Sequence, residues 1–244
     1  MKADPADQER LLELQELDNH IRQVHSKAKN LPEAGVVTEL EAALTESKAA
    51  QRDALTVVDE LKAEMARAES DVKLVEQRIQ KDSEQSQHTS SAKDAQGLEH
   101  EIQSLRERLA MLEEVELGVI ERLEAAESEL SGADQAMTEL VSRLNEAKQA
   151  LDDAKQALEA DYQATSTTRE KLVSSLPEDL VALYERQRER YGFGASLLQR
   201  GISSASGVTL TESDLQQVRQ AAPDDVVICP DSNAILVRTA ESGI

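Results

Sequence analysis

The most constraining feature of this chain is a pair of long stretches in which apolar residues recur at alternating steps of three and four. The first stretch extends from Leu14 to Ile79 and the second from Leu98 to Leu158. A repeat that averages three and a half residues places a narrow apolar seam along a helix, and a partner helix must cover that seam. Because a short polar segment separates two matched seams, the sequence predicts an antiparallel coiled-coil hairpin within one chain.

The hairpin is predicted to occupy residues 1–172, with a kink near 31–36 and a tip near 83–97. Pro32 removes a backbone donor and disfavours a continuous helix at the kink. The tip segment contains no apolar residue larger than alanine, and it is rich in serine. A tip centred near residue 90 would place Ala54 opposite Ala126.

Composition narrows the choice of function. The chain has 31% charged and 2% aromatic residues, too few bulky side chains for the core of a large catalytic domain. Its net charge of -21 opposes a broad phosphate-binding surface and favours basic protein partners. We find no apolar run long enough to span a membrane and no signal sequence, and the chain has a single cysteine. We therefore expect a cytoplasmic protein with no membrane contact.

The C-terminal third has a different pattern. A connecting helix is predicted within residues 173–200, followed by a small α+β domain at 201–244. In that domain a helix begins after Thr211, and strands are expected at 208–210, 226–228 and 234–237. The expected core comprises Tyr184, Tyr191, Phe193, Val208, Leu210, Leu215, Val218, Val226, Ile228, Ile235 and Val237.

Several motifs resemble those of one protein family. They are Leu98-Glu99-His100-Glu101-Ile102 after the tip, Leu176-Pro177-Glu178-Asp179-Leu180 with Tyr184-Glu185-Arg186, and the segment 227–236 around Cys229-Pro230-Asp231-Ser232. Together they resemble the bacterial coiled-coil-hairpin proteins that carry a C-terminal four-cysteine zinc ribbon. The fold class implied is mainly α, a long antiparallel hairpin with a small zinc-ribbon-like domain.

In this resemblance the four metal ligands would be Ser203, Ser206, Cys229 and Ser232. A neutral hydroxyl binds zinc far more weakly than a thiolate, and one sulfur cannot close a tetrahedral site. We therefore predict a degenerate ribbon that lacks its metal ligands, with no structural zinc and no cofactor.

The sequence favours an interaction protein over an enzyme, because we find no nucleophile with a base and no phosphate-binding glycine loop. Our leading hypothesis is a non-enzymatic adaptor that presents its tip and its basal domain to protein partners. The resemblance implies roles of this kind, since family members are linked to sigma factors, secretion or flagellar machinery and RNA. The expected tip contacts are Lys93, Asp94, Gln96 and Glu99.

The alternative is nucleic-acid binding by a basic cluster that interrupts the acidic chain. Its members are Arg186, Arg188, Arg190 and Arg200. A third hypothesis, a hairpin inserted into a polymerase channel, ranks last because such hairpins are much shorter.

Overall fold

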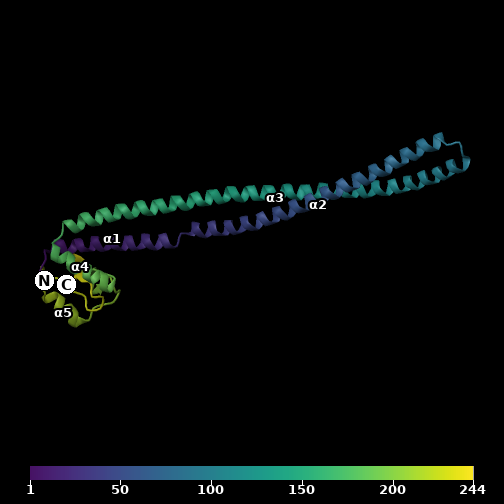
Figure 1. The fold of residues 1–244 in the computed structure, drawn as a ribbon. Helices are drawn as coiled ribbons and strands as arrows, with labels where there is room; N and C mark the ends of the chain where they lie inside the picture. The colour runs from purple at the N-terminus through teal and green to yellow at the C-terminus, as the bar shows by residue number, and fades with distance from the viewer. Residues whose placement is uncertain (244) are drawn as a thin grey trace. The chain divides into compact units, whose positions relative to one another are not determined.

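The computed structural model describes residues 1–243, and these fall into two compact units. The hairpin unit comprises residues 33–149, and the sheet unit comprises residues 1–32 together with residues from 150 onward. Both chain termini belong to the sheet unit (Figure 1). The boundary predicted from the sequence lay near residue 172. In the structure, the first helix and the C-terminal end of the third helix belong to the sheet unit instead.

Three long helices contain the predicted seams. They are α1 (Pro5–Lys29), α2 (Pro32–His88) and α3 (Ala92–Ser174). The side chain of Asp4 caps α1 by accepting the N–H of Ala6 at 2.9 Å. The chain leaves the helical path between α1 and α2, and Pro32 then begins α2, where its missing N–H costs nothing. No helix within residues 1–243 is long and apolar enough to cross a membrane.

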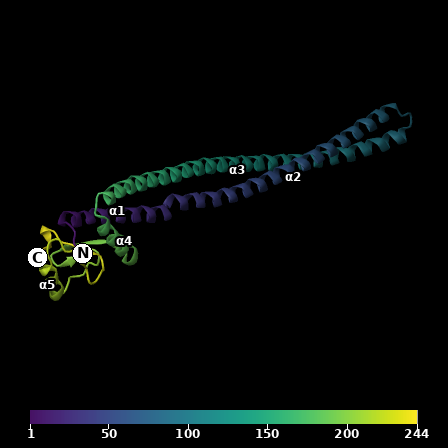
Figure 2. The same ribbon diagram turned by 60° about the vertical axis from the view of Figure 1, so that its left-hand side comes forward.

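Within the hairpin unit, α2 and α3 lie side by side as an antiparallel pair (Figure 2). Val58 and Leu61 form a buried cluster with Ala126. The predicted pairing of Ala54 with Ala126 is therefore wrong by about one to two helical turns. Interlocking side chains set the register in whole turns of helix, and counting residues from the tip does not capture this.

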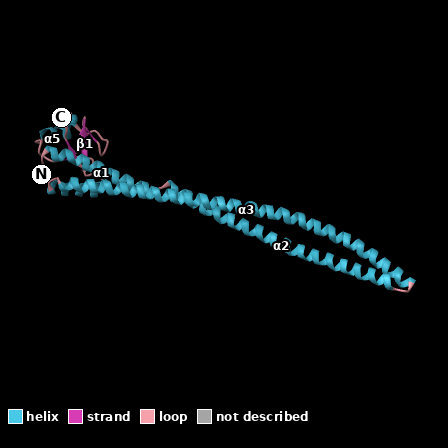
Figure 3. Ribbon diagram, turned by 90° about the horizontal axis from the view of Figure 1, so that it is seen from above, coloured by secondary structure: helices cyan, strands magenta, loops and turns pink. Residues whose placement is uncertain are grey.

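The turn between α2 and α3 comprises only residues 89–91, so the predicted tip at 83–97 was too wide (Figure 3). No proline interrupts the flanking residues, and polar side chains at exposed positions are compatible with helix. The hydroxyl of Ser91 accepts the N–H of Asp94 at 3.4 Å, which helps α3 to begin directly after the turn.

The sheet unit contains a four-stranded sheet in the order β2-β1-β4-β3. Its strands are β1 (Ala195–Gln199), β2 (Ile202–Ser203), β3 (Val227–Ile228) and β4 (Ile235–Val237). The two central strands, β1 and β4, run parallel, and both outer pairings are antiparallel. The remaining elements are α4 (Glu178–Tyr191), α5 (Glu212–Gln220) and the short η1 (Ala240–Ser242).

Two elements of this unit differ from the prediction. The connecting helix does not fill 173–200, because α4 ends at Tyr191 before Gly192 in a left-handed conformation, and β1 follows. The sequence of β1 lacks β-branched residues, and its strand conformation comes from pairing with β4. The expected strand at 208–210 is reduced to one isolated bridge from Thr209 to Ile202.

Alternation along β4 gives the sheet two apolar faces. Ile235 and Val237 join a cluster with Leu11 of α1 and Tyr184 of α4, whereas Leu236 joins a second cluster with Val218 of α5. The helices thus cover both faces of one small sheet. The expected core was partly wrong, since Val208, Tyr191 and Ile228 are exposed and the buried residues of α1 were absent from it.

Candidate interaction sites

The four predicted tip residues all lie on the first two turns of α3. Lys93, Asp94, Gln96 and Glu99 are each exposed to solvent. They follow the short turn directly, so their backbone is held in a regular helix. The four exposed side chains thus place mixed charge around the first two turns of α3.

A buried carboxylate supports this end of the hairpin unit. Asp82 is 1% exposed although it carries a carboxyl group, and its Oδ2 accepts the Nε–H of Arg78 at 2.9 Å. Arg78 also donates from Nη2 to Glu101 of α3 at 2.9 Å. Arg78 thus ties α2 to α3 next to the turn, because one guanidinium serves carboxylates on both helices. The same contacts raise the pKa of Arg78, the hydrogen bond to Glu101 most.

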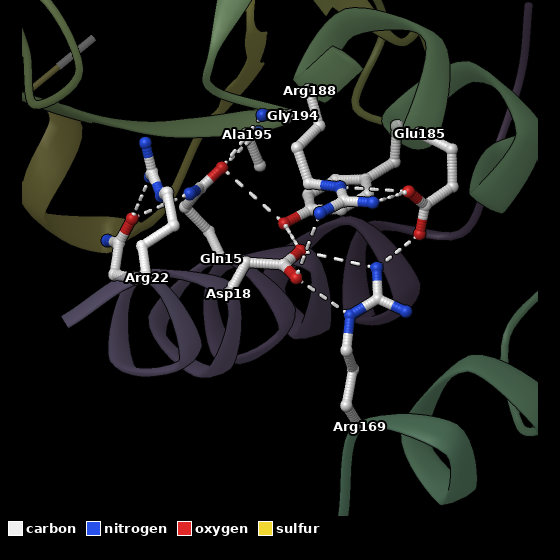
Figure 4. A network of polar contacts seen from close by, with 10 residues as sticks. Gln15, Asp18, Arg22, Arg169, Glu185, Arg188, Gly194 and Ala195 are labelled. Carbon is white, nitrogen blue, oxygen red and sulfur yellow. Dashed lines mark hydrogen bonds and ion pairs between the residues drawn. The ribbon is translucent and has the colours of Figure 1, made fainter. Parts of the chain in front are cut away.

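A network of charged side chains joins three helices of the sheet unit (Figure 4). Asp18 of α1, whose side chain is 3% exposed, accepts Nε–H of Arg169 of α3 at 2.7 Å. Glu185 of α4 accepts from Arg169 and from Arg188. Arg188 also reaches Asp18 at 3.4 Å. Two carboxylates therefore alternate with two guanidinium groups, so each charge faces opposite charges.

Tyr184 links this network to the core. Its hydroxyl donates to Asp18 Oδ2 at 2.7 Å, and its ring lies so close to Gly194 that an added Cβ would lie 2.4 Å from ring carbon Cε2. Burial raises the pKa of Tyr184, and the hydrogen bond to Asp18 adds to the effect. Burial opposes the charge of Arg169, but its hydrogen bonds to Asp18 and Glu185 outweigh this and raise its pKa.

Gln15 of α1 completes the connection between the helices and the sheet. Its Oε1 accepts the backbone N–H groups of Gly194 at 2.7 Å and Ala195 at 3.2 Å, just before and at the start of β1 (Figure 4). Gln15, Asp18 and Arg169 are functional positions that were not predicted from the sequence. One available signal was the position of Gln15 and Asp18, which follow Leu11 and Leu14 at helical spacing on the same side of α1.

The four predicted arginines do not form one free basic surface. Arg188 is held between Asp18 and Glu185, and Arg190 lies 5.3 Å from the centre of the Tyr191 ring. Arg186 and Arg200 are exposed, the latter at the turn between β1 and β2 with a positive φ of 49°. Arg188 is therefore committed to the internal network, and three arginines face solvent.

Three of the four predicted ligand positions come together. Cys229 is fully buried, and its thiol lies beside the side chains of Ser232 and Ser203. Burial opposes the thiolate, but bonds from Ser232, Ser203 and the backbone of Asp231 outweigh it and lower the pKa of Cys229. The fourth position, Ser206, has its hydroxyl 3.3 Å from the backbone nitrogen of Val208, from which it accepts.

The donor set at these positions does not fit a structural zinc ion. The Ser203 hydroxyl lies 2.7 Å from the hydroxyl of Ser196, a buried serine that was not predicted from the sequence. These two neutral hydroxyl groups therefore form a hydrogen bond with each other. Tetrahedral structural zinc requires thiolates or imidazoles, and only one thiol is present. Among residues 1–243, no cluster of three or more His, Cys, Asp or Glu side chains is arranged to hold a metal.

An antiparallel helical hairpin combined with a small mixed sheet defines a class of coiled-coil hairpin proteins. Residues 14–192 match the CT398-like coiled coil hairpin domain, and the chain belongs to this family.

Similar proteins cover nearly the whole chain. The uncharacterized proteins Rv2229c and MT2288, from two strains of Mycobacterium tuberculosis, are 35% identical over 98% of this chain and 98% of their own length. A solved structure from Mycobacterium smegmatis is also 35% identical, with a TM-score of 0.79 over 98% of this chain and 100% of its own. CT398 of Chlamydia trachomatis is 15% identical with a TM-score of 0.59, covering 96% and 98%, and shares the fold.

Proposed function

We propose that this protein is a non-enzymatic adaptor that presents the α2–α3 turn and the sheet unit to different protein partners. The observation that carries the proposal is the exposed group at the start of α3. Lys93, Asp94, Gln96 and Glu99 offer two acids, a base and an amide on two turns of one helix. Such a surface suits specific recognition of a protein, because charge pattern discriminates among partners.

The contacts beneath this surface support a binding role. The ion pairs of Arg78 with Asp82 and Glu101 fix both helices next to the turn. A surface that is ordered before binding loses less conformational entropy when a partner arrives. In the sheet unit, a largely buried network of Asp18, Arg169 and Glu185 likewise holds α1, α3 and α4 together.

The test is quantitative affinity capture from the native cell with the full chain as bait. A tip variant replaces all four tip residues with alanine, and a control variant replaces four other exposed residues of α3. The control residues are Glu124, Ser128, Ser131 and Gln135. We expect at least one protein to be retained by the wild type and the control and to fall about tenfold with the tip variant. If no captured protein depends on the tip or on exposed residues of the sheet unit, the adaptor proposal is wrong.

Nucleic-acid binding is the second proposal and ranks lower, because Arg188 serves the internal network and the chain carries a net charge of -21. Its support is that Arg186, Arg190 and Arg200 are exposed. Replacement of these three by glutamine should weaken binding of RNA or DNA and flatten its salt dependence in a gel-shift titration. Absence of any low-salt binding by the wild type would remove this proposal.

A further inference from the structure

The side chain of Arg238, directly after β4, is half-buried and faces a set of backbone carbonyl groups. Its guanidinium group donates hydrogen bonds to five carbonyl oxygens, at distances from 2.7 to 3.4 Å, and these belong to Val218, Ala221, Ala222, Pro223 and Asp225. The carbonyls come from the end of α5 and from the turn that leads toward β3. We call this set of carbonyl groups the Arg238 cage.

The Arg238 cage suits a guanidinium group for two reasons. The last carbonyl groups of a helix have no partner within the helix, and a positive charge is favoured at that end. Val218 and Ala221 supply such carbonyls at the end of α5, and Nη1 of Arg238 donates to both. Nη2 serves the turn, where its two shortest bonds, to Ala222 and Asp225, measure 2.7 Å each. Arginine carries a planar fork of N–H groups that can reach both sets of carbonyls at once.

The turn after α5 is also where the beginning of the chain is attached. The N–H of Ala3 donates to the carbonyl of Asp224 at 2.8 Å, and the N–H of Val226 donates to the carbonyl of Met1 at 3.0 Å. An exposed ion pair adds to this pairing. Because one side of the pairing lies in the turn, its order depends on what fixes the turn.

The positions that a zinc ribbon would use do not provide an equivalent connection. They hold a single thiol, that of Cys229, and do not fit structural zinc. The chain at this position is closed by backbone hydrogen bonds, since the N–H of Cys229 donates to Ala234 at 2.8 Å and its carbonyl accepts from Asn233 at 2.9 Å. A small domain usually needs a staple in addition to its core, and the Arg238 cage is placed to supply one.

We propose that Arg238 is the staple of the sheet unit in place of a metal ion. One end of its side chain is fixed in the backbone after β4, and the other end holds the end of α5 and the turn, to which the N-terminal segment is attached. A guanidinium group stays charged in proteins and cannot be removed by a chelator. The sheet unit is therefore held without metal, unlike domains whose folding depends on thiolate-bound zinc. This role of Arg238 is independent of the adaptor function.

Amide hydrogen exchange of the full chain measures the staple directly. The probes are the N–H groups of Ala3 and Val226, which are hydrogen-bonded across the N-terminal pairing. In Arg238→Met, both should exchange about a hundredfold faster than in the wild type, because the caged carbonyls lose their donors. Arg238→Lys keeps the charge but offers one compact ammonium group, so both probes should still exchange about tenfold faster or more.

The matched control is Arg219→Met, which removes a different guanidinium group from α5. Arg219 is 44% exposed and forms an exposed ion pair with Glu212, so its loss should change the exchange of both probes by less than about threefold. The wild type should exchange at the same rate with and without a chelator. If Arg238→Met leaves the sheet unit unfolded, the lysine variant and the control decide.

The proposal is wrong if Arg238→Lys exchanges like the wild type, because a positive charge alone would then be enough. It is also wrong if Arg219→Met accelerates exchange as much as Arg238→Met does. Faster exchange of the wild-type probes in the presence of a chelator would likewise overturn it, since a metal ion would then hold the turn.

Discussion

Replacement of Asp18 by asparagine tests the charged network of the sheet unit. Asp18 is 3% exposed and accepts hydrogen bonds from Tyr184, Arg169 and Arg188. Asparagine keeps the shape but replaces one acceptor oxygen with an NH₂ group, which would face N–H or O–H donors. It also leaves two guanidinium groups opposite a neutral amide.

The structure sets the size of the effect. Breaking a buried ion pair costs about 3 to 5 kcal/mol, and a hydrogen bond to a charged group contributes about 1.5 to 3 kcal/mol. Arg169 and Arg188 both keep Glu185, whose side chain is 27% exposed, so part of the compensation remains. We therefore expect Asp18→Asn to lower the free energy of unfolding of the sheet unit by about 2 to 3 kcal/mol.

Urea unfolding followed by near-UV circular dichroism measures this loss. The three tyrosines, Tyr162, Tyr184 and Tyr191, all lie in the sheet unit, so their signal reports on that unit and not on the hairpin unit. The control is Glu127→Gln, which breaks the exposed pair with Lys62 and should change the same transition by less than about 0.5 kcal/mol.

A double variant tests the mechanism. If Asp18 stabilises the unit through Arg169, the cost of Asp18→Asn combined with Arg169→Met should be smaller than the sum of the single costs by about 1 to 3 kcal/mol. Additive costs, or an Asp18→Asn cost no larger than that of the Glu127→Gln control, would refute the argument that the network stabilises the unit.

Three further predictions follow from the sheet unit. Gly194→Ala should lower the unfolding free energy by about 1 to 3 kcal/mol in the same assay, because its Cβ would meet the Tyr184 ring at 2.4 Å. The pKa of Cys229 in the folded state is lowered from 9.0, so ionisation of its thiol should stabilise the fold increasingly as pH rises from the folded-state pKa toward 9.0, and should add nothing below the folded-state pKa. Urea titrations of the wild type and of Cys229→Ala at several pH values measure this contribution. A stability difference that does not change with pH would contradict the prediction. Metal analysis of the purified protein should find no stoichiometric zinc, and a chelator should leave the melting temperature unchanged, because the donor set holds one thiol.

Local rules accounted for much of the helical part of this protein. A seam of period three and a half needs only the sequence to be recognised, and Thr211 marks the start of α5 by its capping hydroxyl, which accepts the N–H of Asp214. Lys93, Asp94 and Gln96 were predicted within a broad tip, whereas the structure places them on the first turns of α3.

Tertiary structure decided what the local pattern could not. β1 became a central strand because β4 offers it hydrogen bonds, although its own residues do not favour a strand. Arg188 looked like part of a basic surface until Asp18, distant in sequence, was placed beside it. The pairing of Val58 and Leu61 with Ala126 likewise depends on how side chains interlock across two helices. The spacing of apolar residues is a property of one segment and can be recognised from the sequence alone. Register, ion pairing and strand order depend instead on which distant segments come into contact.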